Sequence, residues 1–281
     1  MTITTALRTR PLMPNFGVEI MDVDVTRADP ETLAAVVAAF NRHGAILLRS
    51  QNLSPDEQLA FTRQFGRPEG NVRQQFTLPD HPEVYIISNK VVDGRPIGEF
   101  DAGYGWHTDM AYSRRPAMST ILHALEVPAE GSDTLIADLC TAWNALAEDE
   151  QRRIDGLRAH HSFAHYMGKR GIAITPEQQA ENPDVLHPVV RRHVADGRKC
   201  FWFGRASVKE ILGQPDPTDT SLLDRLLAFG TEDRFVYRHK WQVGDVLVWD
   251  NRCTLHTGTP FDLDRYVRVM HRTWVKGEVP M

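Results

Sequence analysis

The sequence is poor in cysteine. Its 281 residues include three, Cys140, Cys200 and Cys253, and their positions lack the close paired spacing of a zinc knuckle or a small disulfide framework. The sequence therefore gives no sign of a small secreted scaffold held together by disulfides. We expect a protein that works in the reducing cytoplasm.

Long hydrophobic runs and a strong charge of one sign are missing as well. No run approaches the roughly 18 apolar residues that a membrane-spanning helix needs, and the first residues lack the continuous apolar segment of a signal peptide. With 32 basic and 37 acidic residues the formal net charge is −5, which gives no broad basic field for nucleic acid or an anionic membrane. We expect a small-molecule substrate, with no nucleic acid and no membrane as partner.

The chain shows no internal repeat, no low-complexity tract and no long linker, so nothing divides it into separate units. Its composition, 42% hydrophobic, can bury one sizeable core. We therefore predict a single domain over residues 1–281. Residues 160–205 combine glycine, proline and charge without a clear period, which predicts a long insertion and candidate lid.

Three segments have the pattern of peripheral helices. Residues 30–43 are amphipathic, and Gly44 follows as a stop. A second helix begins with a capping box at Ser54 and Glu57 and ends near Gly66. Residues 141–160 also show helical periodicity, and we interpret the histidines at 160, 161 and 165 as lying on a polar helix end.

The remaining regular segments predict strands. Residues 84–88, 118–127 and 133–138 are rich in β-branched and apolar residues and are bounded by proline, glycine or aspartate. Four more strand-like segments follow in quick succession in the last third, within RFVYRHKWQ, DVLVWDN, CTLHTG and YVRVMHRTWV. The fold class predicted is mainly β with peripheral helices.

One histidine and one aspartate have the spacing of metal ligands. His107 and Asp109 are two apart in GWHTDMAY, so on an extended strand both side chains leave the same face. His256, in LVWDNRCTLHTGTP, follows a strand and can complete the set. Two imidazoles and one carboxylate are the ligands of non-heme Fe(II) oxygenases. A His-Xaa-Asp triplet alone is weak evidence, because structural histidines produce many such triplets.

Two arginines follow on the next predicted strand. Arg268 and Arg272 are four apart, an even spacing that puts both on one face. A dicarboxylate that chelates iron through one end needs a cation for its far carboxylate, which the planar guanidinium binds bidentately. Arg272 is the candidate for this role. Without the metal triplet, a surface arginine paired with an acidic residue would be the better interpretation.

Taken together, WHTDM, EVPAEGSDTL, GDVLVWDNRCTLH and RVMHRTW resemble the taurine dioxygenase (TauD/TfdA) family of Fe(II)- and 2-oxoglutarate-dependent dioxygenases, in the same order and at compatible spacing. Upstream, GAILLRSQNLSPDEQLAFTRQFG resembles the N-terminal strand and helix of the family. The match spans most of the chain. The resemblance implies a double-stranded β-helix, or jelly roll, with His107, Asp109 and His256 as the iron ligands.

The same resemblance implies roles for other residues. Thr134 in GSDTL is similar to the threonine that hydrogen-bonds the far carboxylate of 2-oxoglutarate, Arg272 to its salt-bridge partner and Arg268 to a neighbouring contributor. Asn89 in IISNK matches a position that often lies near the primary substrate, although an asparagine after a strand is equally a turn residue.

The implied reaction uses O2 and 2-oxoglutarate and releases succinate and CO2 while the substrate is oxidised. Related halogenases replace the carboxylate ligand with a small residue, whereas Asp109 is present here. The resemblance therefore favours hydroxylation over halogenation.

The substrate is less well defined. The taurine enzyme has a substrate-binding histidine after its N-terminal helix, and the corresponding stretch GRPEGNVRQQF has none, which makes taurine doubtful. Arg205 is a candidate contact for a substrate carboxylate or sulfonate, although a solvated loop cation is an equal reading. Tyr104, Tyr112, Tyr166 and Trp202 are candidates for an aromatic wall, although aromatic residues near a barrel mouth are more often simple packing. We expect a small, anionic substrate such as a sulfonate, an aryloxyalkanoate or an amino-acid derivative.

Two alternatives stay open. A zinc hydrolase can use a similar ligand set to activate water, but it has no need of the dicarboxylate-binding residues. A non-catalytic cupin-like binding protein is the other. Members of the resembled family are commonly dimers or tetramers, so we expect a homo-oligomer.

Overall fold

The computed structural model describes residues 6–71, 73–100 and 103–281. The helices are α1 (Pro30–His43), α2 (Pro55–Thr62), α3 (Leu139–Ala145), α4 (Glu148–Ile154), α5 (Phe163–Lys169), α6 (Pro176–Glu181) and α7 (Ser221–Gly230), with short 3-10 turns η1 (Gln74–Phe76), η2 (Arg205–Ser207) and η3 (Asp233–Phe235). The strands are β1 (Thr9–Pro11), β2 (Val18–Ile20), β3 (Ala45–Leu48), β4 (Thr77–Leu78), β5 (His81–Ser88), β6 (Val91–Val92), β7 (Arg95–Pro96), β8 (Ala117–Glu126), β9 (Thr134–Asp138), β10 (Arg158–His161), β11 (Val185–Pro188), β12 (Val190–Arg192), β13 (Lys199–Phe201), β14 (Val208–Leu212), β15 (Val236–His239), β16 (Val246–Asp250), β17 (Thr254–Gly258) and β18 (Val269–Lys276).

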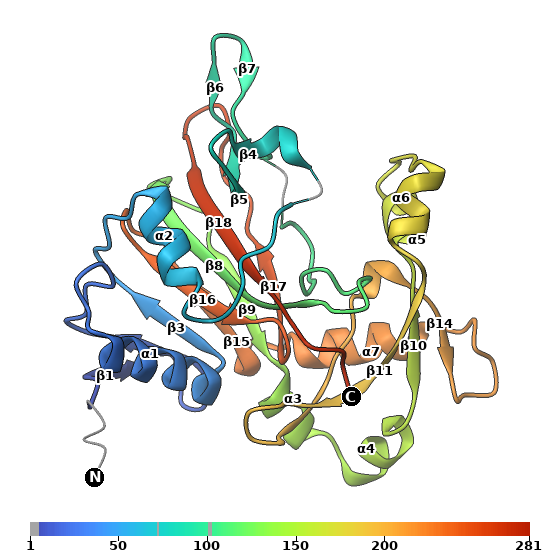
Figure 1. The fold of residues 1–281 in the computed structure, drawn as a ribbon. Helices are drawn as coiled ribbons and strands as arrows, with labels where there is room; N and C mark the ends of the chain where they lie inside the picture. Colours follow the sequence, from blue (N-terminus) through green and yellow to red (C-terminus); the bar gives the residue numbers. More distant parts are fainter. Residues whose placement is uncertain (1–5, 72, 101–102) are drawn as a thin grey trace.

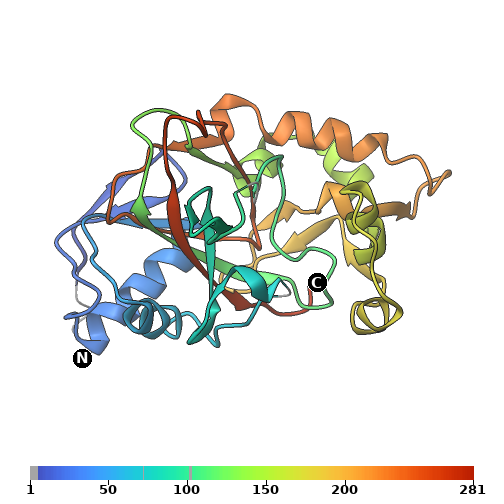
Figure 2. The same ribbon diagram turned by 90° about the horizontal axis from the view of Figure 1, so that it is seen from above.

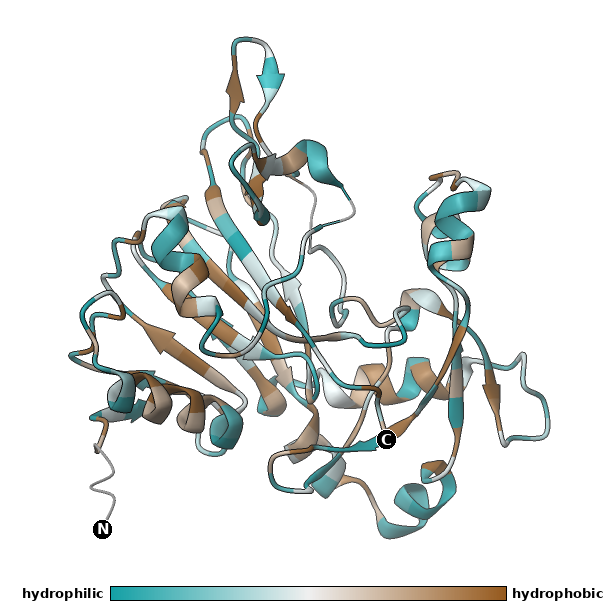
Figure 3. Cartoon of the chain, in the orientation of Figure 1, coloured by the Kyte–Doolittle hydropathy of each residue, from teal (hydrophilic) through white to brown (hydrophobic). Residues whose placement is uncertain are grey.

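An eight-stranded sheet, in the order β1-β2-β3-β16-β8-β18-β5-β4, forms one side of the core, and only β2 and β3 run parallel within it. The central strand β16 is buried along its whole length because both faces are covered. Val246 and Val248 pack under α1 and α2, whereas Leu247 and Trp249 point to the opposite, inner face. The neighbouring strand β3 is brown, the colour of hydrophobic residues, in Figure 3.

A smaller sheet, β15-β9-β17, faces the inner side of the large sheet. Its Ile136 packs with Leu122, Ala124 and Met270 of the large sheet and with Trp241 between them. Two facing antiparallel sheets around one apolar layer are the jelly-roll arrangement, the double-stranded β-helix, although the two sheets do not join into a closed barrel. The predicted mainly β fold with peripheral helices is confirmed (Figure 1).

The first two helices begin and end where the sequence places their caps. The Asp29 side chain accepts a hydrogen bond from the backbone of α1, and Gly44 ends the helix in the left-handed conformation at φ 75°. Ser54 and Glu57 form the predicted capping box of α2. Both helices lie on the outer face of the large sheet, while α3 and α7 lie on the side of the small sheet (Figures 1 and 2).

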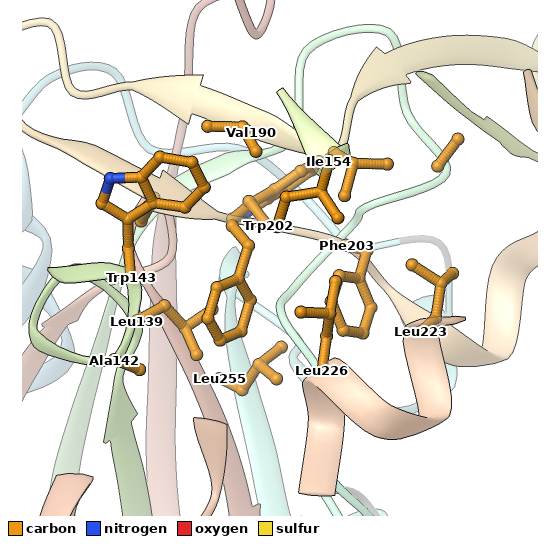
Figure 4. Close-up of a cluster of buried hydrophobic side chains, with 14 of the residues drawn as sticks. Leu139, Ala142, Trp143, Ile154, Val190, Trp202, Phe203, Leu223, Leu226 and Leu255 are labelled. Carbon is orange, nitrogen blue, oxygen red and sulfur yellow. The ribbon is translucent and has the colours of Figure 1, made fainter. Parts of the chain in front are cut away.

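A second apolar cluster joins α3 and α7 to the small sheet. Trp202, Phe203, Leu226 and Leu255 meet there (Figure 4). Trp202 is fully buried and donates from its indole to the Asn251 carbonyl at 2.7 Å. Its predicted place in an aromatic wall is therefore wrong, because this side chain is part of the core.

The helix predicted over residues 141–160 is also wrong in extent. The chain leaves α3 after Ala145, forms the short helix α4 and then enters strand β10, which pairs with β11 and β14 on its two sides. Strand pairing in the folded chain overrides the helical period of this sequence. His160 and His161 consequently lie on a strand, and His161 is fully buried, not on a polar helix end.

The insertion predicted over residues 160–205 has structure of its own. It contains α5 and α6, which project from the body at the right of Figure 1, followed by β11, β12 and β13. Phe201 and Phe203 near its end are buried in the core. Within the insertion, α6 buries none of its residues, whereas α5 buries Phe163. None of the helices in the described ranges has the length and apolar character needed to cross a bilayer.

Candidate active site

His107 and His256 lie side by side although 149 residues separate them. The backbone N–H of His107 donates to the His256 carbonyl at 3.0 Å, and that of His256 to the His107 carbonyl at 2.8 Å. Their ring centroids are 4.1 Å apart. Each Nε2 atom lies 3.8 Å from a different carboxylate oxygen of Asp109. The structure therefore brings the three predicted ligands together.

The prediction that His107 and Asp109 share a strand is wrong. His107 forms an isolated bridge, and the chain turns at Asp109, where Met110 has a φ of 58°. Asp109 accepts hydrogen bonds from the Thr120 hydroxyl at 2.5 Å, and its N–H donates to the Asn251 side chain at 3.3 Å. A turn anchored on two neighbouring strands, in place of strand alternation, directs the carboxylate at the histidines.

The electrostatic environment prepares these groups for a cation. Burial alone would raise the pKa of Asp109, but the charges of His256, Arg272 and His107 lower it to about 2. Burial, together with the His107 charge, lowers the pKa of His256 to about 3. At neutral pH the site holds an anionic carboxylate and a neutral His256 imidazole, the forms that bind metal ions.

The geometry fits a divalent ion. His107 Nδ1 lies 2.7 Å from the Gly105 carbonyl, which leaves Nε2 as its metal-binding atom. The ligand atoms of His107, Asp109 and His256 lie within 4.8 Å of one another. Because bonds from such ligands are about 2.1 Å long, a small inward movement of the side chains is enough to close them around one ion.

A cavity of about 470 Å³ opens beside these ligands. Its wall is rich in aromatic side chains and cations, and includes Tyr85, Tyr104, Trp106, Tyr112, Phe163, Tyr166, Lys169 and Arg272. Three of the four aromatic residues predicted for such a wall, Tyr104, Tyr112 and Tyr166, are therefore in place. The Tyr112 and Tyr166 rings stack at 5.4 Å.

Arg272 lies in this cavity next to the candidate metal ligands. Its Nη1 atom is 3.8 Å from the Asp109 carboxylate, its Nη2 atom donates to the Asn71 side chain at 3.2 Å, and its guanidinium lies 4.9 Å from the centre of the Tyr85 ring. The guanidinium thus faces the space that a substrate beside the metal would fill.

The far wall of the cavity carries a buried carboxylate, Glu99, that sequence reasoning missed. It accepts hydrogen bonds from Arg73, from the Tyr85 hydroxyl and, at 3.3 Å, from Arg170 just after α5. Its backbone is fixed by two hydrogen bonds to β5. Arg73 and Asn71 come from GRPEGNVRQQF, the stretch that lacks the taurine enzyme's histidine. The polar residues of that stretch were the signal in the sequence that it contributes to this cavity.

Thr134 and Arg268 lie in the space between the sheets and are not part of the cavity wall. Thr134 pairs with Gly258 on β17, two residues beyond His256 on the same face. Arg268 is 7% exposed, its Nε has no hydrogen-bond partner, and it forms no ion pair with any residue in the described ranges. Burial lowers the pKa of its guanidinium to about 10. A buried cation without a counter-charge is a strong signal for an anionic ligand.

Two predicted substrate contacts lie elsewhere. Arg205 forms a bidentate ion pair with Asp224 of α7, at 2.5 and 2.9 Å, and is not among the cavity-lining residues. Asn89 accepts a hydrogen bond from the Arg268 backbone at 2.9 Å and donates to the Tyr266 carbonyl at 2.9 Å. Both side chains are thus engaged within the protein, and Asn89 shapes the loop that leads to Arg268.

Comparisons with known proteins agree on one family. Residues 8–274 match the family described as taurine catabolism dioxygenase TauD, TfdA family. The α-ketoglutarate-dependent 2,4-dichlorophenoxyacetate dioxygenase of Cupriavidus pinatubonensis is 35% identical over 266 residues, covering 90% of this chain and 92% of the relative.

Solved structures give the same answer. A taurine dioxygenase from Burkholderia xenovorans is 31% identical with a TM-score of 0.80, covering 98% of this chain and 92% of that one. The structure of AAD-2 in complex with Mn(II) and N-oxalylglycine is 26% identical with a TM-score of 0.82, covering 98% and 99%. This chain therefore belongs to the TauD/TfdA family and is a dioxygenase that depends on 2-oxoglutarate and a metal ion.

Proposed function

We propose that the protein is an Fe(II)- and 2-oxoglutarate-dependent dioxygenase that hydroxylates a small anionic substrate, and that His107, Asp109 and His256 hold the iron. The observation that carries this proposal is the convergence of the three ligands beside a cavity lined by Arg272. Bound iron would couple two reactions. One is the oxidative decarboxylation of 2-oxoglutarate, which gives succinate and CO2, and the other is the oxidation of the substrate by O2.

The two arginines divide between cosubstrate and substrate in this proposal. Arg268 and Thr134 bind the far carboxylate of 2-oxoglutarate, because both are buried between the sheets and both have donor groups without an acceptor among the described residues. Arg272, which the sequence favoured for that carboxylate, lies next to Asp109 and lines the cavity. Its guanidinium is therefore better placed to bind the anionic group of the substrate.

An aryloxyalkanoate is the substrate class that the cavity supports best. Its carboxylate would pair with Arg272, and its ring would lie among Tyr104, Tyr112 and Tyr166. The relative from Cupriavidus pinatubonensis is named for a substrate of this kind. Sulfonates and amino-acid derivatives share the anionic group and belong in the same screen. The Asp109 carboxylate favours hydroxylation over halogenation.

We also propose that the part of the insertion around α5 and α6 acts as a lid. Phe163, Tyr166 and Arg170 from this region line the cavity, and Arg170 reaches across to Glu99. A bound substrate would therefore contact both the jelly roll and the insertion.

A zinc hydrolase is less well supported by this arrangement. Hydrolysis by a metal-bound water requires no dicarboxylate cosubstrate. Arg268, which is buried and has no ion-pair partner within the described ranges, would then have no role, and neither would the Thr134 hydroxyl.

For the assembly and location of the protein, we propose a homo-oligomer, a dimer or tetramer, in the cytoplasm. The projecting β6 and β7 hairpin carries exposed Val91 and Val92, 57% and 48% accessible, which we propose as a candidate subunit contact. Light scattering on the purified protein would give the subunit number.

The test of the proposed function is spectroscopic. Anaerobic protein with Fe(II) and 2-oxoglutarate should develop a visible metal-to-ligand charge-transfer band, which His107→Ala should abolish. Succinate release would then be measured across aryloxyalkanoates, sulfonates and amino acids. If iron-loaded protein gave no such band, the proposal would be contradicted. A zinc hydrolase or a non-catalytic binding protein would then be the better interpretation.

A further inference from the structure

We propose that Trp241 is a positioning residue for the cosubstrate, because its indole N–H fixes the Thr134 hydroxyl with its proton directed at the far carboxylate of 2-oxoglutarate. This inference rests on the proposed function. The indole nitrogen donates to Thr134 Oγ1 at 3.0 Å, and both side chains are buried, at 9% and 4% exposure.

The chemistry of the pair sets the direction of the hydroxyl proton. An indole N–H is only a donor, so the Thr134 oxygen is the acceptor and its own proton must point elsewhere. Among the residues that the structure describes, no acceptor takes that proton. The indole excludes the rotamer that would point the O–H bond at Trp241, so the proton is confined to directions away from the indole before any ligand arrives.

The surroundings of this hydroxyl suit an anion. Gly258, the cross-strand partner of Thr134, presents no side chain, and a Cβ atom there would lie 3.9 Å from the Tyr104 ring. Thr134 and Arg268 are both buried, and each has a donor group without an acceptor among the described residues. An anion bound between the sheets would supply that acceptor.

A chain of buried contacts holds Trp241 in place. Its ring meets His239 edge-on, with centroids 4.4 Å apart and an interplanar angle of 90°. His239 Nε2 lies 3.0 Å from Asp245, and Asp245 also accepts from Arg49 at 2.6 Å and from the Gln242 N–H at 2.9 Å. Because Asp245 binds three partners, the indole has little freedom to turn away from Thr134.

The experiment is a double-mutant cycle on ligand binding, not on turnover. Calorimetric titration of Mn(II)-loaded protein with 2-oxoglutarate gives the dissociation constant for wild type, Trp241→Phe, Thr134→Ala and the double variant. Each single change should weaken binding about three- to tenfold, the value of one hydrogen bond. The double variant should bind no more weakly than Thr134→Ala, because Trp241 acts through the hydroxyl.

Further variants separate positioning from folding. Thr134→Ser keeps the hydroxyl and should retain both binding and the effect of Trp241→Phe. Trp241→Leu provides a second side chain without any donor at that position, should Trp241→Phe unfold. Trp143→Phe, in the other apolar cluster, is the matched control and should leave the dissociation constant unchanged.

Additive losses in the double variant, or unchanged binding in Trp241→Phe, would overturn the inference while leaving the proposed function intact. A wild-type protein that binds no 2-oxoglutarate would instead remove the proposed function and this inference with it. In steady-state assays, Trp241→Phe should raise the KM for 2-oxoglutarate and leave the KM for the substrate unchanged.

Discussion

The candidate metal site and the far wall of the cavity are built in different ways. His107 and His256 are joined by two backbone hydrogen bonds, and Asp109 is tied to two strands through Thr120 and Asn251. The wall around Glu99 is fixed to β5 through its backbone and Tyr85, but its two charged partners, Arg73 and Arg170, reach it from segments between the strands. The metal ligands are thus held by backbone pairing and neighbouring strands, whereas the charges of the wall come in part from segments that can vary without disturbing the sheets.

The strongest test of this comparison is loss of a metal ligand. His256→Ala should reduce both metal content and 2-oxoglutarate turnover more than about 100-fold, since even partners behind a metal ligand contribute about 10- to 100-fold. Metal analysis of the purified variant, with succinate release as the assay, checks this outcome. A variant that keeps a full equivalent of iron would contradict the assignment.

The division of the two arginines is tested next. Arg272→Ala should lower kcat/KM for an anionic substrate at least about 30-fold, because a charge contact in a desolvated site contributes about 2 kcal/mol or more. Arg268→Ala should instead weaken 2-oxoglutarate binding by a similar factor. Calorimetry with 2-oxoglutarate and kinetics with the substrate distinguish the two. An Arg272→Ala variant that loses only 2-oxoglutarate affinity would restore the original prediction from sequence.

A smaller effect is expected at the wall. Glu99→Gln weakens the ion pairs to Arg73 and Arg170 and should raise the substrate KM about tenfold, with 2-oxoglutarate affinity nearly unchanged. Glu126→Gln, which breaks a half-exposed pair with Lys90, is the matched control. Equal effects of the two changes would show that the wall does not select the substrate.

A separate effect concerns the stability of the fold and its dependence on pH, not catalysis. Burial lowers the pKa of His187 to about 4, below its ordinary value of about 6.5. The unfolded chain therefore binds the proton first, so stability is full above pH 6.5 and falls as the pH drops from 6.5 towards 4. The full loss from this group is on the order of 3 kcal/mol. Urea unfolding from pH 7.5 to 4.5 should show most of it, and His187→Gln should make the fall shallower, with other buried histidines such as His271 still contributing.

The sequence predicted best where a residue's role is local. The capping box of α2 and the stop at Gly44 depend on a few neighbouring residues, and the structure has both. The strands of the jelly roll follow from apolar runs that two covering layers bury. The family resemblance added the ligand set, because its motifs keep their order along the chain.

Prediction was weaker where distant segments decide the outcome. Residues 158–161 have a helical period, yet pairing with β11 and β14 makes them a strand. Arg205 and Arg272 are both arginines near motif residues, and only the fold pairs one with Asp224 and directs the other at Asp109. An ion-pair partner 19 residues away cannot be chosen from local pattern alone.

The sequence by itself determined the β core, the capped helices and the residue types of a candidate iron site, because periodicity, caps and short motifs are local properties. The tertiary structure alone decided which side chains meet. It turned Asp109 towards the histidines, buried Arg268 without a counter-charge from any residue that the structure describes, and brought Glu99 together with Arg170. Those outcomes depend on strand register and on burial, which are set by the packing of the whole chain.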